Sequence, residues 1–240
     1  MVTLVAAFGI VLLSAVAQAV SGFGFALLAV PLLAAATDAR TAVVVASLAS
    51  LGLNLTAVAQ ERAHVRWRTA NLVTAAAVVG MPAGLLILVF APERLLTALI
   101  AAVVLGCTLL VWREARFRTG AGAVGAVGVL VGILTTSTGT NGPPLVAAFH
   151  ALGYDPRTFR ATLATTFAGT GVIGLAGFLV TDQISGGILR IAAIAPPAVL
   201  LGWWLGNRIF ARVDPVTFRR IVLVGLVASS GAALARALTG

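Results

Sequence analysis

Apolar segments follow one another along the whole chain, and charged residues are confined to the short intervals between them. A helix needs about 20 mostly apolar residues to cross the hydrocarbon core of a bilayer, so a chain of 240 residues holds roughly eight to ten such segments and little else. This pattern predicts an all-α integral membrane protein. The apolar segments are 2–20, 24–36, 41–60, 69–90, 93–112, 120–137, 142–152, 158–180, 187–208 and 216–238.

The composition excludes several classes of protein. Hydrophobic residues make up 60% of the chain and charged residues 10%, whereas a soluble domain has about 45–50% and about 25%. The net charge of +9 comes from 16 arginines, no lysine and seven acids. It does not indicate nucleic-acid binding, which needs a clustered basic face on a solvated domain. Cys107 is the single cysteine, which excludes a disulfide framework, and we expect neither a cofactor nor a metal site.

The arginines predict how the chain lies in the membrane. Twelve of the sixteen fall in four intervals that share one side when all ten segments are counted: 61–68, 113–119, 153–160 and 208–220. Because cytoplasmic loops carry the excess of basic residues, this side is predicted to be cytoplasmic and both termini to face outward. The expected location is the cell inner (plasma) membrane.

The first segment ends in Ala17-Gln18-Ala19, which resembles a signal-peptidase site. No basic residue precedes this segment, and apolar sequence resumes directly after it. We therefore expect the segment to be retained rather than cleaved.

Segments 24–36 and 142–152 are too short to cross a bilayer as straight helices. Each follows a longer segment across a glycine-containing break, at 21–25 in the first case and at 137–144 in the second. We therefore expect segments one and two, and segments six and seven, to form broken or re-entrant hairpins. Both breaks then lie inside the membrane, where bare backbone is tolerated only when it is buried in protein or lines a cavity.

The chain contains an internal repeat. The motif Asp-x-Arg-Thr at 38–41 recurs at 155–158, and the same offset of 117 residues carries Gly22 onto Gly139. The repeat divides one compact membrane domain into halves 1–118 and 119–240, each with five segments. Because five is odd, the second half enters the membrane from the opposite side, an inverted topology typical of secondary transporters. Chance similarity among segments rich in Ala, Val, Leu and Gly is the alternative.

The two breaks have the chemistry of an anion site. A helix starts just after each break, and a helix N-terminus carries about half a positive charge and four unpaired N–H groups. Two such ends near the midplane would bind an anion without a buried cation. Simple helix punctuation, with Ser and Thr as N-caps, is the alternative. The candidate residues are Ser21, Gly22, Phe23, Gly24 and Phe25 in the first half, and Ser137, Thr138, Gly139, Thr140, Asn141 and Gly142 in the second.

Polar side chains recur at helical spacing on two further segments. They are Ser47, Ser50 and Asn54 on the third segment, and Thr162, Thr166 and Thr170 on the eighth. Such stripes either form hydrogen bonds between helices or line a substrate path, and Asn54 and Thr166 join the candidate site. All seven acids lie at segment ends or in loops, so the interior has no carboxylate relay of the kind used by proton-driven carriers.

The stretches 21–33 and 139–146, with the motif at 155–158, resemble the sulfite/sulfonate exporter (TauE/SafE-like) family. That family typically has a glycine-rich run followed by Pro-Leu in each half. Phe25 and Asn141 stand where the family often has glycine. The resemblance implies transport of small sulfur-containing or other organic anions, such as sulfite, sulfonates or sulfoacetate.

The sequence thus predicts a secondary transporter that binds a small anion at the two breaks and works by alternating access. An anion channel or uniporter of the same architecture is the alternative. An intramembrane enzyme built on Ser137 and His150 is disfavoured because no orienting acid lies close in sequence. The expected partners are the anion and the lipid bilayer. The sequence leaves open a coupling ion, H⁺ or Na⁺, and pairing into a homodimer.

Overall fold

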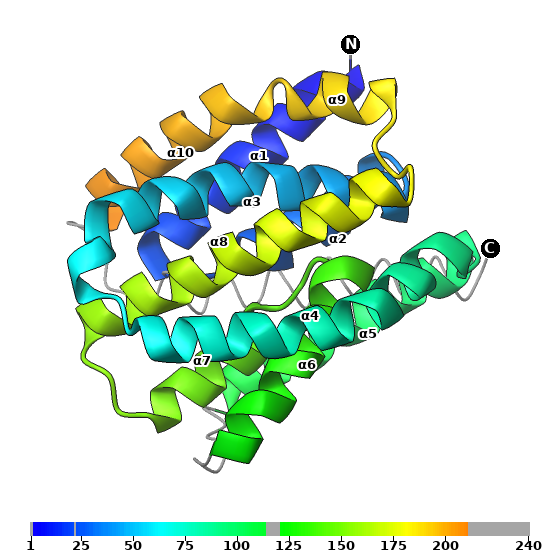
Figure 1. Cartoon of the computed structure of the whole chain (residues 1–240). Coiled ribbons are helices and arrows are strands. Elements are labelled where there is room, and N and C mark those ends of the chain that lie inside the picture. The colour runs from blue at the N-terminus through cyan, green and yellow to red at the C-terminus, as the bar shows by residue number, and fades with distance from the viewer. Residues whose placement is uncertain (1, 22, 114–120, 211–240) are drawn as a thin grey trace.

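The computed structural model of the protein describes residues 2–21, 23–113 and 121–210. Within these residues the fold is entirely helical (Figure 1). This confirms the all-α prediction, and eight of the ten predicted segments correspond to single helices; the tenth, 216–238, lies outside the described residues. The helices are α1 (Val2–Ser21), α2 (Phe25–Ala36), α3 (Ala39–Glu61), the 3-10 helix η1 (Arg62–His64), α4 (Trp67–Phe90), α5 (Glu93–Trp112), α6 (Ala121–Ser137), α7 (Gly142–Ala151), α8 (Pro156–Val180), α9 (Gly186–Ala192) and α10 (Ala195–Phe210).

Length and surface identify a protein that crosses the membrane several times. Five of the described helical stretches are long and apolar enough to span a bilayer. Large apolar side chains also cover the outside of the bundle: Val79 is 71% exposed, Phe90 75% and Val180 86%. A soluble monomer rarely exposes so much apolar surface, whereas lipid accommodates it without cost.

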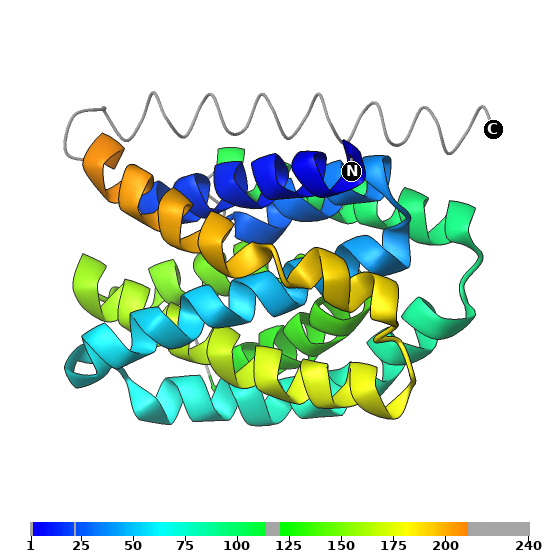
Figure 2. The same ribbon diagram turned by 90° about the horizontal axis from the view of Figure 1, so that it is seen from above.

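The helices form a bundle with α3 and α8 side by side and antiparallel in its middle (Figure 1). The pair α1 and α10 lies on one side of them, and the pair α4 and α6 on the other. Both views place the connections 62–66 and 152–155 and the end of α10 at the same end of the bundle (Figures 1 and 2). We call it the arginine end, because it carries Arg62, Arg66, Arg68, Arg113, Arg157, Arg160 and Arg208, whereas the described part of the opposite end carries Arg40, Arg94 and Arg190.

The two Asp-x-Arg-Thr motifs start the two central helices. Asp38 is the N-cap of α3 and accepts a hydrogen bond from the N–H of Thr41 at 2.9 Å. Asp155 is the N-cap of α8 and accepts from the N–H groups of Arg157 and Thr158, each at 3.1 Å. The hydrogen bonds from Thr158 lower the pKa of the Asp155 carboxyl, since they favour its charged form. The repeated motif is therefore a helix-start signal in both halves.

Glycines let the outer helix pairs approach closely. A Cβ added to Gly80 of α4, or to Gly132 of α6, would collide with a backbone carbonyl oxygen of the other helix. On the other side, a Cβ on Gly202 or Gly206 of α10 would lie within 2.6 Å of an alanine Cβ of α1. These are the contacts expected of small residues four apart in membrane helices.

The ninth predicted segment, 187–208, is corrected by the structure. It is not one helix but α9 and α10, with a turn at Ala193 and Ile194 between them. Pro196 and Pro197 follow that turn. Neither has a backbone N–H to donate to the preceding turn, so the helix cannot continue through them and a new one starts there.

Candidate functional site

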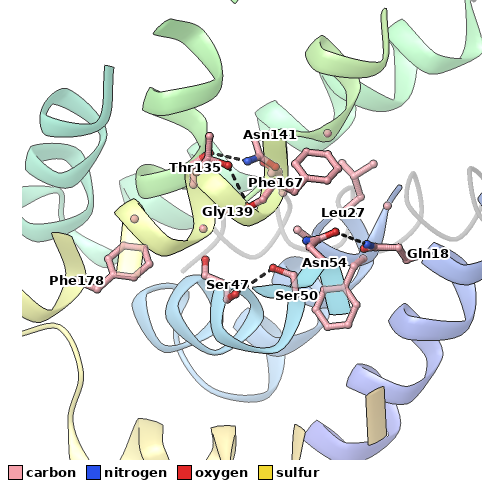
Figure 3. A pocket seen from close by; sticks show the side chains of 18 residues that line it. Gln18, Leu27, Ser47, Ser50, Asn54, Thr135, Gly139, Asn141, Phe167 and Phe178 are labelled. Carbon is pink, nitrogen blue, oxygen red and sulfur yellow. Dashed lines mark hydrogen bonds between the residues drawn. The ribbon is translucent and has the colours of Figure 1, made fainter. Parts of the chain in front are cut away.

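A small cavity lies at the centre of the bundle, between α3, α8 and the first turns of α2 and α7 (Figure 3). Ser50 is the middle residue of α3 and Phe167 lies next to the middle of α8, and both line it, so the cavity is at half depth along these helices. About 40 Å³ of it is open to the centres of water-sized groups. Since one water needs about 10–15 Å³ of such space, the cavity holds a group about the size of a few waters.

The chain bends sharply at both breaks to reach this cavity. Gly24, the N-cap of α2, has φ +105°, and Gly139, just before α7, has φ +67°. Both values lie in the left-handed region that favours glycine. A Cβ on Gly139 would also lie 3.2 Å from a methyl group of Val30. The glycines therefore allow α2 and α7 to start where they do, with their first turns beside the cavity.

Two amide side chains meet at one wall of the cavity. The Nε2 of Gln18, near the end of α1, donates to the Oδ1 of Asn54 on α3 at 3.1 Å (Figure 3). Both residues are buried, Gln18 at 7% exposure and Asn54 at 4%. This bond uses the acceptor of Asn54 and leaves its Nδ2 group, with two N–H donors, without a partner among the described residues. A buried, unpaired donor in a cavity wall is costly unless something in the cavity accepts from it.

Most other polar groups around the cavity are already bonded. Asn141 Nδ2 donates to the hydroxyl of Thr135 at 2.6 Å, which in turn donates to the Val131 carbonyl at 2.7 Å. The Thr170 hydroxyl donates to a carbonyl of its own helix at 2.9 Å. The Ser47 hydroxyl faces the cavity without a hydrogen bond within the described structure. The lining thus presents spare donors from Asn54 and Ser47 beside the amide carbonyl oxygens of Gln18 and Asn141, and its described residues carry no negative charge.

No ionisable side chain is among the described residues that line the cavity. The groups that can supply positive potential there are the N-termini of α2 and α7, whose first turns line the cavity. Their contributions differ, because Pro143 and Pro144 occupy the first turn of α7 and lack N–H groups. The start of α2, by contrast, keeps the N–H groups of Phe25, Ala26 and Leu27. We therefore expect α2 to supply more backbone donors than α7.

The structure brings seven of the thirteen sequence-predicted residues to the cavity wall: Gly24, Phe25, Asn54, Gly139, Thr140, Asn141 and Gly142. Phe23 packs beside Gly142 instead. Ser137, Thr138 and Thr166 are buried and do not line the cavity, and their hydroxyls donate to carbonyls four residues earlier in the chain. Ser21 is the last residue of α1, and Gly22 lies outside the described residues.

Sequence reasoning missed several residues of the wall. Gln18 is the main one, and its signal is its position as the single amide in a mostly apolar helix. Phe167 and Phe178 of α8 also line the cavity and are indistinguishable in sequence from lipid-facing aromatic residues. Among the described residues, no group of three His, Cys, Asp or Glu side chains is arranged to hold a metal ion.

Comparison with known proteins identifies the family. The family model described as sulfite exporter TauE/SafE matches residues 7–233. The chain belongs to the TauE/SafE family. A relative from Cupriavidus necator, named probable sulfite/organosulfonate exporter TauE, is 30% identical over 226 residues, which cover 88% of this chain and 87% of the relative. No solved structure matches the chain significantly.

TauE/SafE proteins are transporters rather than enzymes, so this chain is a multi-pass membrane transporter. The geometry agrees with the exclusion of a serine–histidine site. The Ser137 hydroxyl is bonded to the Ile133 carbonyl at 2.7 Å, and His150 is exposed near the end of α7.

Proposed function

We propose that this TauE/SafE protein is a secondary transporter of small anions, sulfite or organosulfonates, which binds its substrate in the central cavity and works by alternating access. The observation that carries the proposal is the Asn54 amide, 4% exposed, with both Nδ2 donors free at the wall of a cavity without ionisable side chains. A buried donor of this kind needs an acceptor, and an oxyanion is a strong one.

The size of the cavity favours a small oxyanion. Its volume of about 40 Å³ suits an ion such as sulfite, whereas an organosulfonate with its carbon chain requires the cavity to widen. The name of the Cupriavidus necator relative, a probable sulfite/organosulfonate exporter, supports this choice of substrates.

Alternating access is supported by matching contacts in the two proposed inverted repeats. Helix α4 holds the fourth position in the first half and packs on α6, the first helix of the second half. In the same way, α10 belongs to the fourth position in the second half and packs on α1, the first helix of the first half. Helices α3 and α8, third in each half, pack on each other. Such contacts are expected when two halves are related by a two-fold axis in the membrane plane.

The cavity itself draws on equivalent positions of the two halves. Five pairs of lining residues are separated by the offset of 117 residues found in the sequence. They are Gln18 and Thr135, Gly24 and Asn141, Phe25 and Gly142, Ser50 and Phe167, and Asn54 and Gly171. A two-fold axis through the cavity would account for this pairing, and transporters of this type bind substrate at the repeat interface.

The proposal is tested with purified protein in proteoliposomes. We expect saturable uptake of ³⁵S-sulfite that is accelerated by unlabelled sulfite inside the vesicles, because a carrier returns faster when loaded. Imposed pH and sodium gradients would identify the coupling ion. Absence of sulfite and sulfonate flux would refute the proposed substrates, and flux linear in concentration without exchange would show a channel instead.

A further inference from the structure

A second cavity lies at the arginine end, between the last turns of α3, the first turns of α8 and Trp203 of α10. We call it the vestibule. Its volume is about 270 Å³, against about 40 Å³ for the central cavity on the same measure. Arg157 and Arg160 line it and are exposed, so it is reached from the water at that end of the bundle.

The vestibule has an excess of positive charge. Of the two arginines, Arg157 forms an ion pair with Glu61, its Nε lying 3.3 Å from a carboxylate oxygen. Glu61 is also contacted by the imidazole of His64 at 3.5 Å. Arg160 has no ion pair within the described part of the chain. With Glu61 neutralised by Arg157, one positive charge, that of Arg160, is left to attract an anion.

The vestibule adjoins the central cavity through a single pair of side chains. Gln18 and Asn54 line both cavities, and among the described residues they are the two that do so. Their hydrogen bond of 3.1 Å holds them together as a partition. The same Asn54 amide that offers donors to the central cavity is thus the boundary of the vestibule.

We propose that the vestibule is a second binding position for the transported oxyanion, in which Arg160 holds the anion on the water side of the Gln18–Asn54 partition. This inference rests on the proposed function, since it assigns the vestibule to the same anion. Charge in a recess with low-dielectric walls raises the local concentration of counter-ions. The anion therefore collects at Arg160, one residue layer away from the central cavity.

Trp203 makes the occupancy of the vestibule measurable. It lines the vestibule, whereas the other tryptophans, Trp67, Trp112 and Trp204, do not. A variant with these three replaced by Phe keeps Trp203 as its one tryptophan. Trp203 also borders an apolar cavity that has no charged residue among its described lining, so the charge-dependent part of its quenching reports the vestibule. Its fluorescence is titrated with iodide, an anionic quencher, and with acrylamide, a neutral one, at constant ionic strength.

We expect Arg160→Gln to lower the iodide quenching constant about threefold, the factor for one unit charge about 6 Å away in water. Acrylamide quenching should not change, because access to Trp203 is the same. Arg160→Lys should restore iodide quenching. Arg68→Gln is the matched control: Arg68 is exposed at the same end but does not line the vestibule, so its loss should change neither constant. Sulfite should protect Trp203 from iodide.

Equal iodide quenching in the Arg160→Gln variant and its parent would overturn the inference, as would a parallel fall in acrylamide quenching. Charge-dependent iodide quenching without competition by sulfite would refute the assignment to the transported anion. The flux assay separates this failure from that of the proposed function, because sulfite transport by the wild type would then persist.

Discussion

Hydroxyl groups in the core of this protein are mostly bonded to carbonyls of their own helices, as Thr135, Thr166 and Thr170 show. Such bonds satisfy the hydroxyl inside a membrane protein but leave it without a donor for a ligand. Asn54 differs because its carbonyl oxygen is used by Gln18 while its amino group is not. At the scale of single residues, Asn54 is thus the buried amide whose free donors set the cavity wall apart from the bonded hydroxyls around it.

Asn54→Leu is therefore expected to raise the half-saturating concentration of sulfite in the flux assay by about 10- to 100-fold. The estimate corresponds to losing one hydrogen bond to a charged group, about 1.5–3 kcal/mol. Leucine keeps the branched shape and the number of heavy atoms of the side chain and removes its donors. The measurement is uptake by proteoliposomes containing equal amounts of folded protein, judged by size-exclusion profile.

Thr166→Val is the matched control for this variant. Thr166 is as deeply buried as Asn54, but its hydroxyl donates to the Thr162 carbonyl at 2.9 Å and does not line the cavity. Its loss should leave sulfite transport unchanged. Equal impairment by the two substitutions would contradict the distinct role given to Asn54.

These two residues also show what spacing in a sequence determines. Spacing correctly grouped polar residues on α3 and α8, because helical periodicity decides which side chains share a face. It does not decide whether a hydroxyl points to a neighbour or bonds back to its own helix, as Thr166 does. It also does not show that Gln18 of α1 meets Asn54 of α3. Hydrogen-bond partners depend on the packing of several helices, which one sequence does not specify.

At the scale of helices, the close contact of α4 and α6 depends on glycines that have no room for a side chain. Gly132→Ala is expected to lower the thermal unfolding midpoint in detergent, because its Cβ would collide with the Ala77 carbonyl oxygen. Gly125→Ala, on the same helix with nothing within 4 Å of the added Cβ, serves as control. Gly125→Ala should keep or slightly raise the unfolding midpoint, since alanine is about 1 kcal/mol more favourable than glycine inside a helix. Equal midpoints for both variants would contradict the packing argument.

Helix boundaries are largely predictable, because most breaks between the described helices carry a side-chain cap, a proline or a glycine; the break between α3 and α4 carries charged residues instead. Asp38 and Asp155 mark the starts of α3 and α8 in sequence and in structure. The break between α9 and α10 was not predicted, although Pro196 and Pro197 mark it. Those prolines sit inside a continuous apolar run, and hydropathy alone does not distinguish a span that is one helix from a span divided into two.

At the scale of the whole molecule, the arginines are distributed unequally between the two ends, and those at the poorer end are partly structural. Arg40 donates to the carbonyls of Leu88, Val89 and Ala91 at 2.8–3.2 Å, so it caps the end of α4. At the arginine end, by contrast, Arg62, Arg66 and Arg68 are all exposed. Exposed basic residues near helix ends are those that the positive-inside rule counts, and they favour a cytoplasmic arginine end.

This orientation predicts the outcome of cysteine labelling on intact cells. Cys107, the single cysteine, is buried and can be replaced by serine to give a silent background. Ala63→Cys places a thiol on η1 at the arginine end, and Gly186→Cys places one at the start of α9 at the other end; both positions are exposed. A membrane-impermeant maleimide should label position 186 in intact cells and position 63 only after permeabilisation. The predicted pattern places the vestibule on the cytoplasmic side, where an exporter collects its anion. The reverse pattern would contradict this orientation and place the vestibule outside the cell, where an exporter releases its anion.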